Sequence, residues 1–449
     1  MRASIFAVLA LGLCATPALI AAADGARVVD LDECIRMGFA HDAGLHSDEL
    51  ETRVADARLR EMQGQYVPSV SLQGGYSRLS DVAAGSMNTD VSLGGPPMPM
   101  TITFPPPLDN NTSVRISLQQ PLFTGKRIAA SIRQAEALRD SSMSDLGKSR
   151  LDLRYAITEA YWNLARAKTQ REAIDQSVAQ AESHLADARK LLDQGMATNN
   201  DVLQAQMRLE DSKIDLSSLE TMRDIARVRL ALLIGLPWDA ALDIAEDTPS
   251  QNVEIPQGSV ADLVARALAK RPEIQSARLR VTAQEASVEA ARSGLFPNVF
   301  LTGDYTVANP NQRVFPQVDQ FTPTWSLGIL ASIDLGRYPQ VMAQEEQASS
   351  KLTQAQESSR KMADVVAEDV IRAYLTLREA AGRLVSLRQE TAQAVENDRV
   401  TQERYRQGVA LSSESLDAQT LVVRARLRED GALFDCLVAR AALDRAVGE

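Results

Sequence analysis

The residues that most often carry catalysis or ligate metals are scarce in this chain. His41, His46 and His184 are its only histidines, and they lie on predicted helical stretches without the spacing of metal ligands. The chain has no glycine-rich phosphate loop and no Gly-x-Ser-x-Gly motif that would present a nucleophilic serine. The sequence therefore predicts no catalytic residue, no metal site and no cofactor, and it argues against an enzyme.

The cysteines allow two interpretations. Cys14 lies in a segment predicted to be removed, so the mature chain keeps Cys34 and Cys436. In an oxidising compartment these two thiols could form a disulfide. We favour the alternative, in which both are small buried apolar side chains.

The first residues have the pattern of a secretory signal peptide, predicted to be residues 1–23. Arg2 supplies the positive start, residues 5–13 form a short apolar run, and residues 21–23 offer a small-residue cleavage site. Lipid modification of Cys14 is the alternative, which the bulky Leu13 before it disfavours. No later segment offers about 18 consecutive apolar residues, so any entry into a membrane must use β-structure. The formal net charge of −11 argues against a nucleic-acid partner.

Stepwise matches between the two halves of the chain indicate an internal repeat. Each half reads as helix, strand, loop, strand, very long helix, Gly turn and helix. The matched segments are residues 65–70 with 294–299, 159–164 with 372–377, and 192–195 with 405–408. We predict a first repeat over 24–236, a linker or equatorial segment over 237–258, and a second repeat over 259–449.

Period-two alternation marks two strand pairs, at about 68–123 and about 297–334. One face carries residues such as Val70, Leu72, Trp325, Leu327 and Ile329, and the other is small or polar. This alternation is typical of a barrel strand with lipid outside and water inside. A soluble two-hairpin sheet is less favoured, because nothing else in the chain would cover its second face. The Pro- and Gly-rich stretches 81–110 and 308–321 are expected to be irregular exposed loops.

Two very long helices are predicted, over about 128–194 and about 340–407. No proline interrupts the first, and at about 1.5 Å per residue it would extend about 100 Å. Apolar residues repeat at heptad spacing on both sides of a turn near 195–200, which predicts an antiparallel helical hairpin. A second hairpin would turn near 408–413. The members of the first seam are Ile174, Val178, Ala181, Leu185, Ala188, Leu192, Val202, Ala205, Leu209, Ser212, Leu216 and Leu219.

Four strands cannot close a membrane barrel, so the chain is expected to oligomerise. A dimer would give about eight strands with a filled lumen, and a trimer about twelve strands around water. Polar residues predicted on the inner face favour the trimer. These are Ser69, Gln73, Arg115, Gln119, Thr302 and Asp304.

The doubled plan, the signal peptide and the Gly turns resemble the TolC-like outer-membrane efflux proteins. The stretch that carries the resemblance most specifically is 405–419 (YRQGVALSSESLDAQ). The matching stretch of the first repeat, 195–202, carries it less specifically. The resemblance implies an α+β membrane protein of two structural repeats. Four strands per chain would join a homotrimeric barrel of about twelve strands in the outer membrane of a Gram-negative type envelope, continued by a long periplasmic α-helical barrel.

As a function, the resemblance implies an exit duct for small molecules such as drugs, metals and toxic compounds, or for secreted proteins. The implied partners are a periplasmic adaptor protein, an inner-membrane pump of the RND, ABC or MFS type, and outer-membrane lipid. The sequence does not separate small-molecule efflux from type I protein secretion. A secreted or surface structural coiled-coil protein without a pore is the alternative function.

Several site residues are implied by the same resemblance. Glu414 and Asp417 would form carboxylate rings at the periplasmic aperture, which select cations and are plugged by multivalent ones. The alternative role of these acids, favouring a helix N-terminus, is compatible with the rings. Asp201 and Tyr405 match a network that closes the aperture. Its arginine position is Ala410 here, so Arg404 or Arg406 is a candidate replacement, and the turns at Gly195 and Gly408 would contact the adaptor.

Overall fold

The computed structural model describes residues 27–80, 85–91, 94–96, 98–103, 108–245, 256, 258–315, 317–407 and 409–449. The predicted signal peptide, with Cys14, lies outside these residues, as does Gly408. The chain forms two compact units. The first combines Met1–Met37 with Ala160–Pro249, and the second combines Gly38–Glu159 with Ser250–Glu449.

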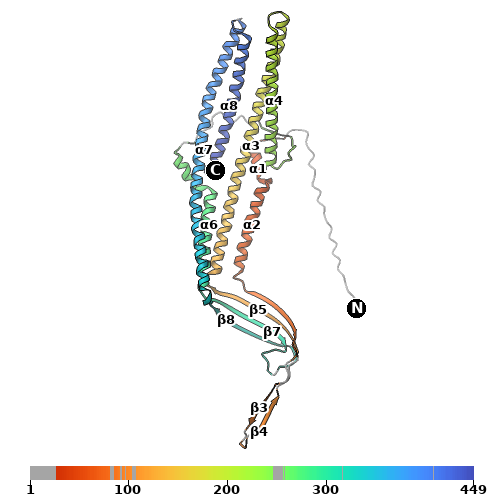
Figure 1. Cartoon of the computed structure of the whole chain (residues 1–449), viewed down its shortest axis with the longest axis vertical. Coiled ribbons are helices and arrows are strands. Elements are labelled where there is room, and N and C mark those ends of the chain that lie inside the picture. The colour runs from red at the N-terminus through yellow and green to blue at the C-terminus, as the bar shows by residue number, and fades with distance from the viewer. Residues whose placement is uncertain are drawn as a thin grey trace, which may run out of the picture. The chain divides into compact units, whose positions relative to one another are not determined.

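Helices dominate both units (Figure 1). Their bounds are α1 (Leu31–His41), α2 (Ala43–Gly64), α3 (Arg127–Asp193), α4 (Asn199–Leu233), α5 (Val260–Lys270), α6 (Pro272–Arg292), α7 (Tyr338–Arg406) and α8 (Ser412–Val447). Two short 3-10 helices cover Ser293–Leu295 and Leu335–Arg337. The two long helices predicted from the sequence are confirmed as α3 and α7, which have 67 and 69 residues. Within the described residues, no helix has a stretch both long and apolar enough to cross a membrane.

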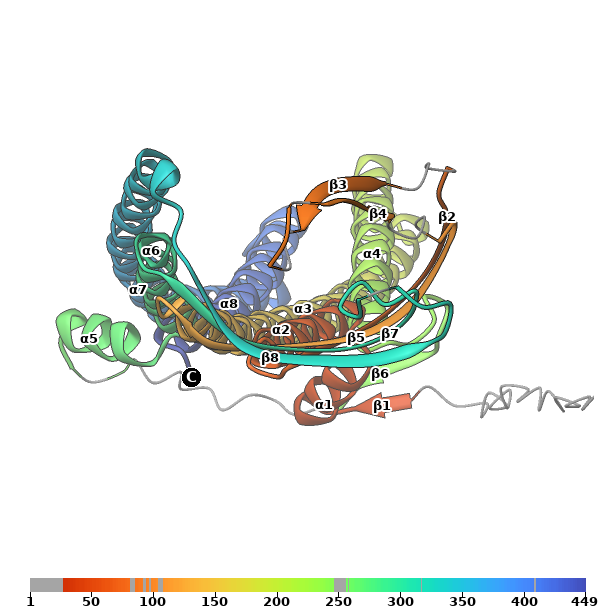
Figure 2. The ribbon, with the colours of Figure 1, turned by 90° about the horizontal axis from the view of Figure 1, so that it is seen from below.

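The strands form one four-stranded antiparallel sheet and two small two-stranded sheets. Their bounds are β1 (Arg27–Val29), β2 (Ser69–Arg78), β3 (Ser86–Val91), β4 (Met98–Thr103), β5 (Asn110–Thr124), β6 (Leu242–Ile244), β7 (Asn298–Asn309) and β8 (Thr322–Ser332). The four-stranded sheet has the order β2-β5-β7-β8, and it bends along its length (Figure 2). It lies wholly in the second unit.

The register of the large sheet confirms the predicted alternation of faces. Cross-strand partners share a face, and Ser69 pairs with Gln119, Gln119 with Thr302, and Thr302 with Gly328. These positions belong to the polar face. The apolar set includes Leu72 on β2 and Leu327 on β8, which fall on the other face by the same register.

The expectation that 81–110 is wholly irregular is wrong, because β3 and β4 pair there as an antiparallel hairpin. One cluster of glycine and proline lies at the turn of this hairpin, which includes residues 94–96. Pro99 lies within β4 opposite Asp90. In a ribbon of two strands each strand has a free edge, where a missing N–H costs no ladder bond. Residues 105–107 and Pro316 lie outside the described residues.

In the first unit, the predicted heptad seam holds the hairpin of α3 and α4 together. Leu185 and Ala188 pack with Val202, Ala205 and Leu209. Val178, Ala181 and Leu192 are partly buried against this cluster. The segment predicted as a linker contains β6, which pairs in parallel with β1. Two side chains of the hairpin hold it: Lys168 Nζ lies 3.2 Å from Asp243 Oδ1, and Arg227 Nη1 donates to the Ala240 carbonyl at 2.6 Å.

In the second unit, α7 and α8 run side by side (Figure 1) around apolar clusters. One cluster joins residues of α5, α6, α7 and α8, and another contains Ala380, Leu384, Ala432 and Cys436. Arg271, between α5 and α6, is buried and pairs with Glu273 and Asp369, so its charge is compensated where water is excluded.

Cys34 and Cys436 are both free and buried in the structure. Burial raises the pKa of the Cys34 thiol to about 12 and raises the pKa of the Cys436 thiol above its ordinary value. Both groups therefore stay protonated at neutral pH, which suits small buried side chains and not a reactive thiolate.

Replacing Gly125 with Ala should weaken the junction between β5 and α3. Gly125 has a φ of +59°, and an added Cβ would lie 2.6 Å from the Ser293 carbonyl oxygen. Such strain costs about 1–3 kcal/mol, so we expect a lower thermal midpoint, measured by circular dichroism of the purified protein in detergent.

Gly382→Ala is the matched control. An added Cβ there meets nothing within 4 Å in the middle of α7, and removing a helical glycine stabilises by about 0.5–1 kcal/mol. Equal midpoints for the two variants would contradict the role assigned to Gly125.

Candidate functional site: the hairpin turns and the polar face of the sheet

The first hairpin turn depends on Gly195. It has a left-handed φ of +71°, which costs glycine nothing because it has no Cβ. Its N–H donates to the Leu192 carbonyl at 2.9 Å, and the Met196 N–H donates to the Leu191 carbonyl at 2.8 Å. These bonds satisfy the last carbonyls of α3 and reverse the chain toward α4.

A capping box starts α4 directly after this turn. The N–H and the hydroxyl of Thr198 each donate to Asp201 Oδ2 at 2.8 Å, and the Asp201 N–H donates back to the Thr198 hydroxyl at 3.3 Å. The hydrogen bonds from the Thr198 backbone and side chain hold the pKa of the Asp201 carboxyl below its ordinary value. Asp201 is therefore an ionised cap of α4 at neutral pH.

The second turn joins α7 to α8 without a side-chain cap. The N–H groups of Val409 and Ala410 donate to the Arg404 carbonyl at 2.9 and 3.3 Å. Leu411 is the N-cap residue of α8, and its side chain makes no cap hydrogen bond. The first N–H groups of α8 therefore lack the side-chain acceptor that α4 has, which favours a nearby negative charge.

Glu414 and Asp417 lie on the exposed side of α8, next to this turn. They are three residues apart, so their side chains share one face of the helix. Ser415 and Ala418, each one residue further on, are buried. The structure thus presents both predicted acids away from the hairpin's own seam, and Glu414 also lies in the first turn of α8.

The predicted closing network stays a prediction. The Asp201 carboxylate is engaged by Thr198 in the first unit, and Tyr405 lies in the second unit. Tyr405 makes no hydrogen bond through its hydroxyl to any residue that the structure describes. Ala410 is buried, and Arg406 pairs with Glu403 at 3.8 Å, one turn back on α7. The capping role of Asp201 could have been read from the Thr-x-x-Asp pattern.

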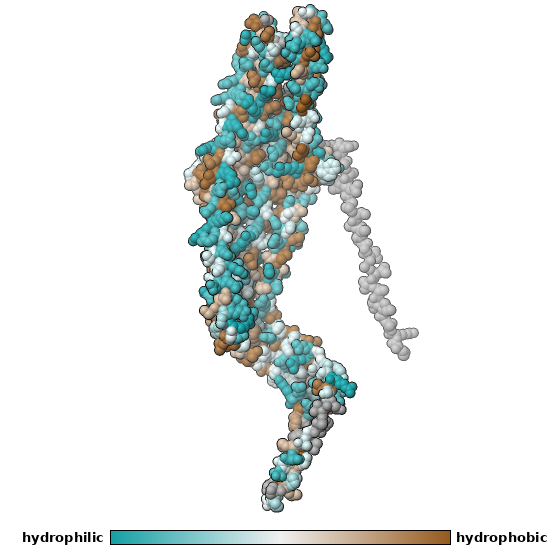
Figure 3. Space-filling model, in the orientation of Figure 1, coloured by the Kyte–Doolittle hydropathy of each residue, from teal (hydrophilic) through white to brown (hydrophobic). Residues whose placement is uncertain are grey.

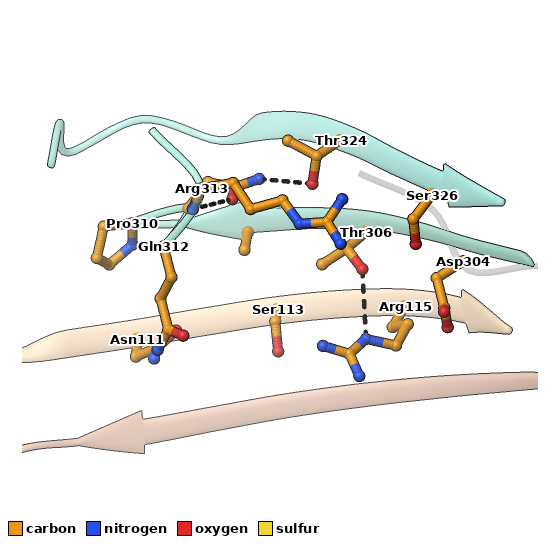
Figure 4. A pocket seen from close by; sticks show the side chains of 12 residues that line it. Asn111, Ser113, Arg115, Asp304, Thr306, Pro310, Gln312, Arg313, Thr324 and Ser326 are labelled. Atoms are coloured by element: carbon orange, nitrogen blue, oxygen red, sulfur yellow. Dashed lines mark hydrogen bonds between the residues drawn. The ribbon is translucent and has the colours of Figure 1, made fainter. Parts of the chain in front are cut away.

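A polar pocket of about 270 Å³ lies on the polar face of the large sheet (Figure 4). The sequence did not predict this pocket. Its charged lining residues are Arg115 on β5, Asp304 on β7 and Arg313 from the loop between β7 and β8. Arg115 Nε donates to the Thr306 hydroxyl at 3.3 Å. The sequence placed Arg115 and Asp304 on this face, but it carried no signal that the loop would bring Arg313 over them.

Among the described residues, no group of three or more His, Cys, Asp or Glu side chains could hold a metal ion. His184 is half-buried, and burial lowers its pKa, so it is neutral at neutral pH.

A comparison with protein families identifies the chain. The family described as "Outer membrane efflux protein" matches residues 39–236 and 263–449. The chain belongs to the outer membrane efflux protein family. The match covers most of both predicted repeats, including both hairpin turns and all four strands of the large sheet.

Named members of the outer membrane efflux family are distant relatives. The chain is 28% identical to the fusaric acid resistance protein FusA of Burkholderia cepacia, over 38% of this chain and 32% of that protein. It is 24% identical to the pyoverdine export outer membrane protein OpmQ of Pseudomonas putida, over 69% of this chain and 66% of that protein. The match thus spans about a third of the length of FusA and just under two-thirds of the length of OpmQ.

The fold of this outer membrane efflux protein matches solved channels over nearly its whole length. Against the outer-membrane channel OprN it has a TM-score of 0.75 at 21% identity, covering 93% of this chain and 89% of that one. The fold is that of a TolC-like channel. In that fold, each chain contributes strands to a shared outer-membrane barrel, which long periplasmic helices continue.

Acid should open the start of α4. Because the folded-state pKa of Asp201 is lowered, its stabilisation is complete above the ordinary value of 3.8 and is lost as the pH falls through the lowered value. We expect hydrogen-exchange protection of the first-turn amides to stay constant from about pH 6 to about pH 4 and to fall below about pH 4. Asp201→Asn should have low protection throughout that range.

Asp215→Asn, an exposed acid in the middle of α4, is the control and should behave like the wild type. A pH dependence that persists in Asp201→Asn would contradict the assignment.

Proposed function

We propose that this protein is an exit duct in the outer membrane, through which solutes leave the periplasm. The observation that carries this is the large sheet, whose apolar face is uncovered in the single chain. Leu72 is 72% exposed, Trp325 is 74% exposed and Ile329 is 70% exposed. Lipid covers such a face, while water meets the polar face behind it. A free coiled-coil rod, the alternative function, has no use for this sheet.

We propose that three copies complete the duct. In the described sheet β2 and β8 are the edges, and backbone groups along an edge cannot stay unpaired in lipid. Pairing β2 of one copy with β8 of the next closes a barrel of about twelve strands. The family supports this stoichiometry, since TolC-like outer-membrane factors are trimeric.

The surface of α4 supports contact between copies along the helices as well. Besides the seam that faces α3, α4 carries a second apolar row on its opposite face. The row consists of Leu203, Met207, Ile214, Met222, Ile225 and Leu232, with exposed fractions between 52% and 68%. Figure 3 shows hydrophobic side chains among hydrophilic ones on the surface of the helical segments. An exposed apolar row at helical spacing on α4, outside the lipid-facing sheet, favours burial against a neighbouring chain.

We propose that Glu414 and Asp417 form the selective ring at the periplasmic aperture and that the chain has no catalytic activity. Three copies of each acid would set a negative potential in a narrow opening. Their exposure next to the turn, away from the seam with α7, supports this role.

We further propose that the turns at Gly195 and Gly408 meet a periplasmic adaptor and that an inner-membrane pump supplies the energy. TolC-like factors work with such partners, which supports the assignment to the class but not to one pump type. Among the relatives, FusA is named for fusaric acid resistance and OpmQ for pyoverdine export. These names favour small-molecule efflux over protein secretion as the cargo class.

Ile214→Lys should disrupt the trimer. A lysine in the exposed apolar row would place a charge in the helix contact between copies, which is expected to cost about 2–5 kcal/mol. We expect loss of the heat-sensitive trimer band on electrophoresis in mild detergent. Gln206→Lys adds the same charge to α4 outside the apolar row and should keep the trimer. Equal trimer yields for both variants would remove the apolar row from the interface.

Replacing Glu414 and Asp417 together by Ala should relieve block of the pore by trivalent cations. The removed carboxylates are the binding groups for the blocking ion, so we expect a rise of at least about tenfold in the half-blocking concentration. Single-channel recording in planar bilayers measures this. Glu346→Ala with Asp364→Ala removes the same charge from exposed positions on α7, and block should persist there. Unchanged block in the first variant would place the ring elsewhere.

A further inference from the structure

The loop between β7 and β8 is folded onto the polar face of the large sheet. Asn311 anchors it and is only 4% exposed. Its Nδ2 donates to the Thr322 carbonyl at 2.7 Å and to the Thr324 hydroxyl at 3.1 Å, and its Oδ1 accepts from the Arg313 N–H at 3.0 Å. The loop is therefore built to hold Arg313 over the sheet.

Arg313 and Arg115 line the same pocket (Figure 4). Arg313 Nη1 donates to the Trp325 carbonyl at 3.1 Å, and Arg115 Nε donates to Thr306. Among the described residues, the structure gives each guanidinium one hydrogen bond, and a guanidinium has five N–H donors. Within the described part of the chain, neither guanidinium lies within 4.0 Å of a carboxylate, although ion pairs hold many other arginines of the second unit.

Asp304, the only acid among the described residues that line the pocket, does not cancel both positive charges. Asp304 accepts a hydrogen bond from the Ser117 hydroxyl at 2.6 Å. Two arginines against one carboxylate leave an excess positive charge beside neutral hydrogen-bonding groups, including Asn111, Gln312 and Ser326. Like charges held in one pocket repel, and an anion that bridges them removes that cost.

We propose that this pocket binds small multivalent oxyanions, carboxylates or phosphates, and that it makes the far end of the duct favour anionic cargo. Guanidinium groups bind the paired oxygens of such anions through parallel N–H donors. A volume of about 270 Å³ lies at the lower end of ligand pockets, which suits a small polyanion.

The position of the pocket follows from the connections of the strands. β5 leads into α3, β7 follows α6, and β8 leads into α7. These three connections between strand and helix all lie at the sheet end that contains Thr124, Asn298 and Ser332. The pocket lies at the opposite end, beside the loop between β7 and β8. Its place in a lumen rests on the proposed export duct, whereas binding itself needs only residues of one chain.

Equilibrium dialysis of the purified trimer in detergent against radiolabelled pyrophosphate tests the site, at low ionic strength where charge contacts are least screened. We expect saturable binding of one pyrophosphate per chain. Arg115→Gln and Arg313→Gln should each weaken it by about tenfold, since each removes one charged donor set. The double variant should abolish it, and Asp304→Asn should tighten it.

Two further variants separate a built site from general positive charge. Arg78→Gln removes an arginine from the end of β2 that pairs beside the pocket residue Asn111. By register Arg78 lies on the apolar face of the sheet and not on the polar face, so binding should be unchanged. Asn311→Ala keeps both arginines but releases the loop, so binding should weaken. Unlabelled citrate added together with the radiolabelled pyrophosphate should compete with it, because the site recognises charge and oxygen geometry.

Absence of saturable binding by the wild type would overturn the proposal, as would equal binding by the double variant or equal loss in Arg78→Gln. The assay needs no ion flow through the protein. A trimer that binds pyrophosphate but does not conduct would therefore count against the duct and leave the site standing.

Discussion

Backbone hydrogen bonds along the two open edges of the large sheet are the constraint on which the assembly depends. β2 and β8 end the described sheet, and each unpaired peptide group in lipid costs several kcal/mol. Four strands cannot meet this demand within one chain. Because β5 continues through Gly125 into α3, the copies that close the sheet also bring their helices together. In the proposed trimer, strand pairing therefore dictates the symmetry of the helical part.

The helices carry narrow apolar seams, which suit the proposed wall shared between copies better than a compact core. α4 carries one apolar seam packed against α3 and another that stays exposed on the single chain. Narrow seams of Ala, Val and Leu need few large side chains, which accounts for an aromatic content of only 4%. The buried cysteine of α8 fits the same rule, since Cys436 is a small member of the seam with α7.

The sequence predicted the elements whose apolar residues repeat at strand or helix spacing. It missed the features that depend on the contacts of individual side chains. Period-two and heptad patterns located the large sheet and the first hairpin, down to Leu185 facing Val202 and Ala205. The hairpin of β3 and β4 was missed because proline was taken as a strand breaker, which holds inside a sheet but not at a free edge. Asp201 was assigned to a closing network, which stays a prediction, and its cap role was not read from the Thr-x-x-Asp pattern. The path of the loop near Arg313 depends on the buried Asn311, which no periodicity marks.

The two charged regions of the second unit are far enough apart to act separately. α7 begins just after β8 and ends just before the turn that leads to Glu414, and its 69 residues extend about 100 Å. Charge interactions in physiological salt are screened over about 8 Å. The carboxylates beside the turn therefore exert no direct field on Arg115 and Arg313 at the far end of the sheet. Each region can favour ions of the charge opposite to its own, cations at the carboxylates and anions at the arginines, so substitutions that change the selectivity of one end are free to leave the other unchanged.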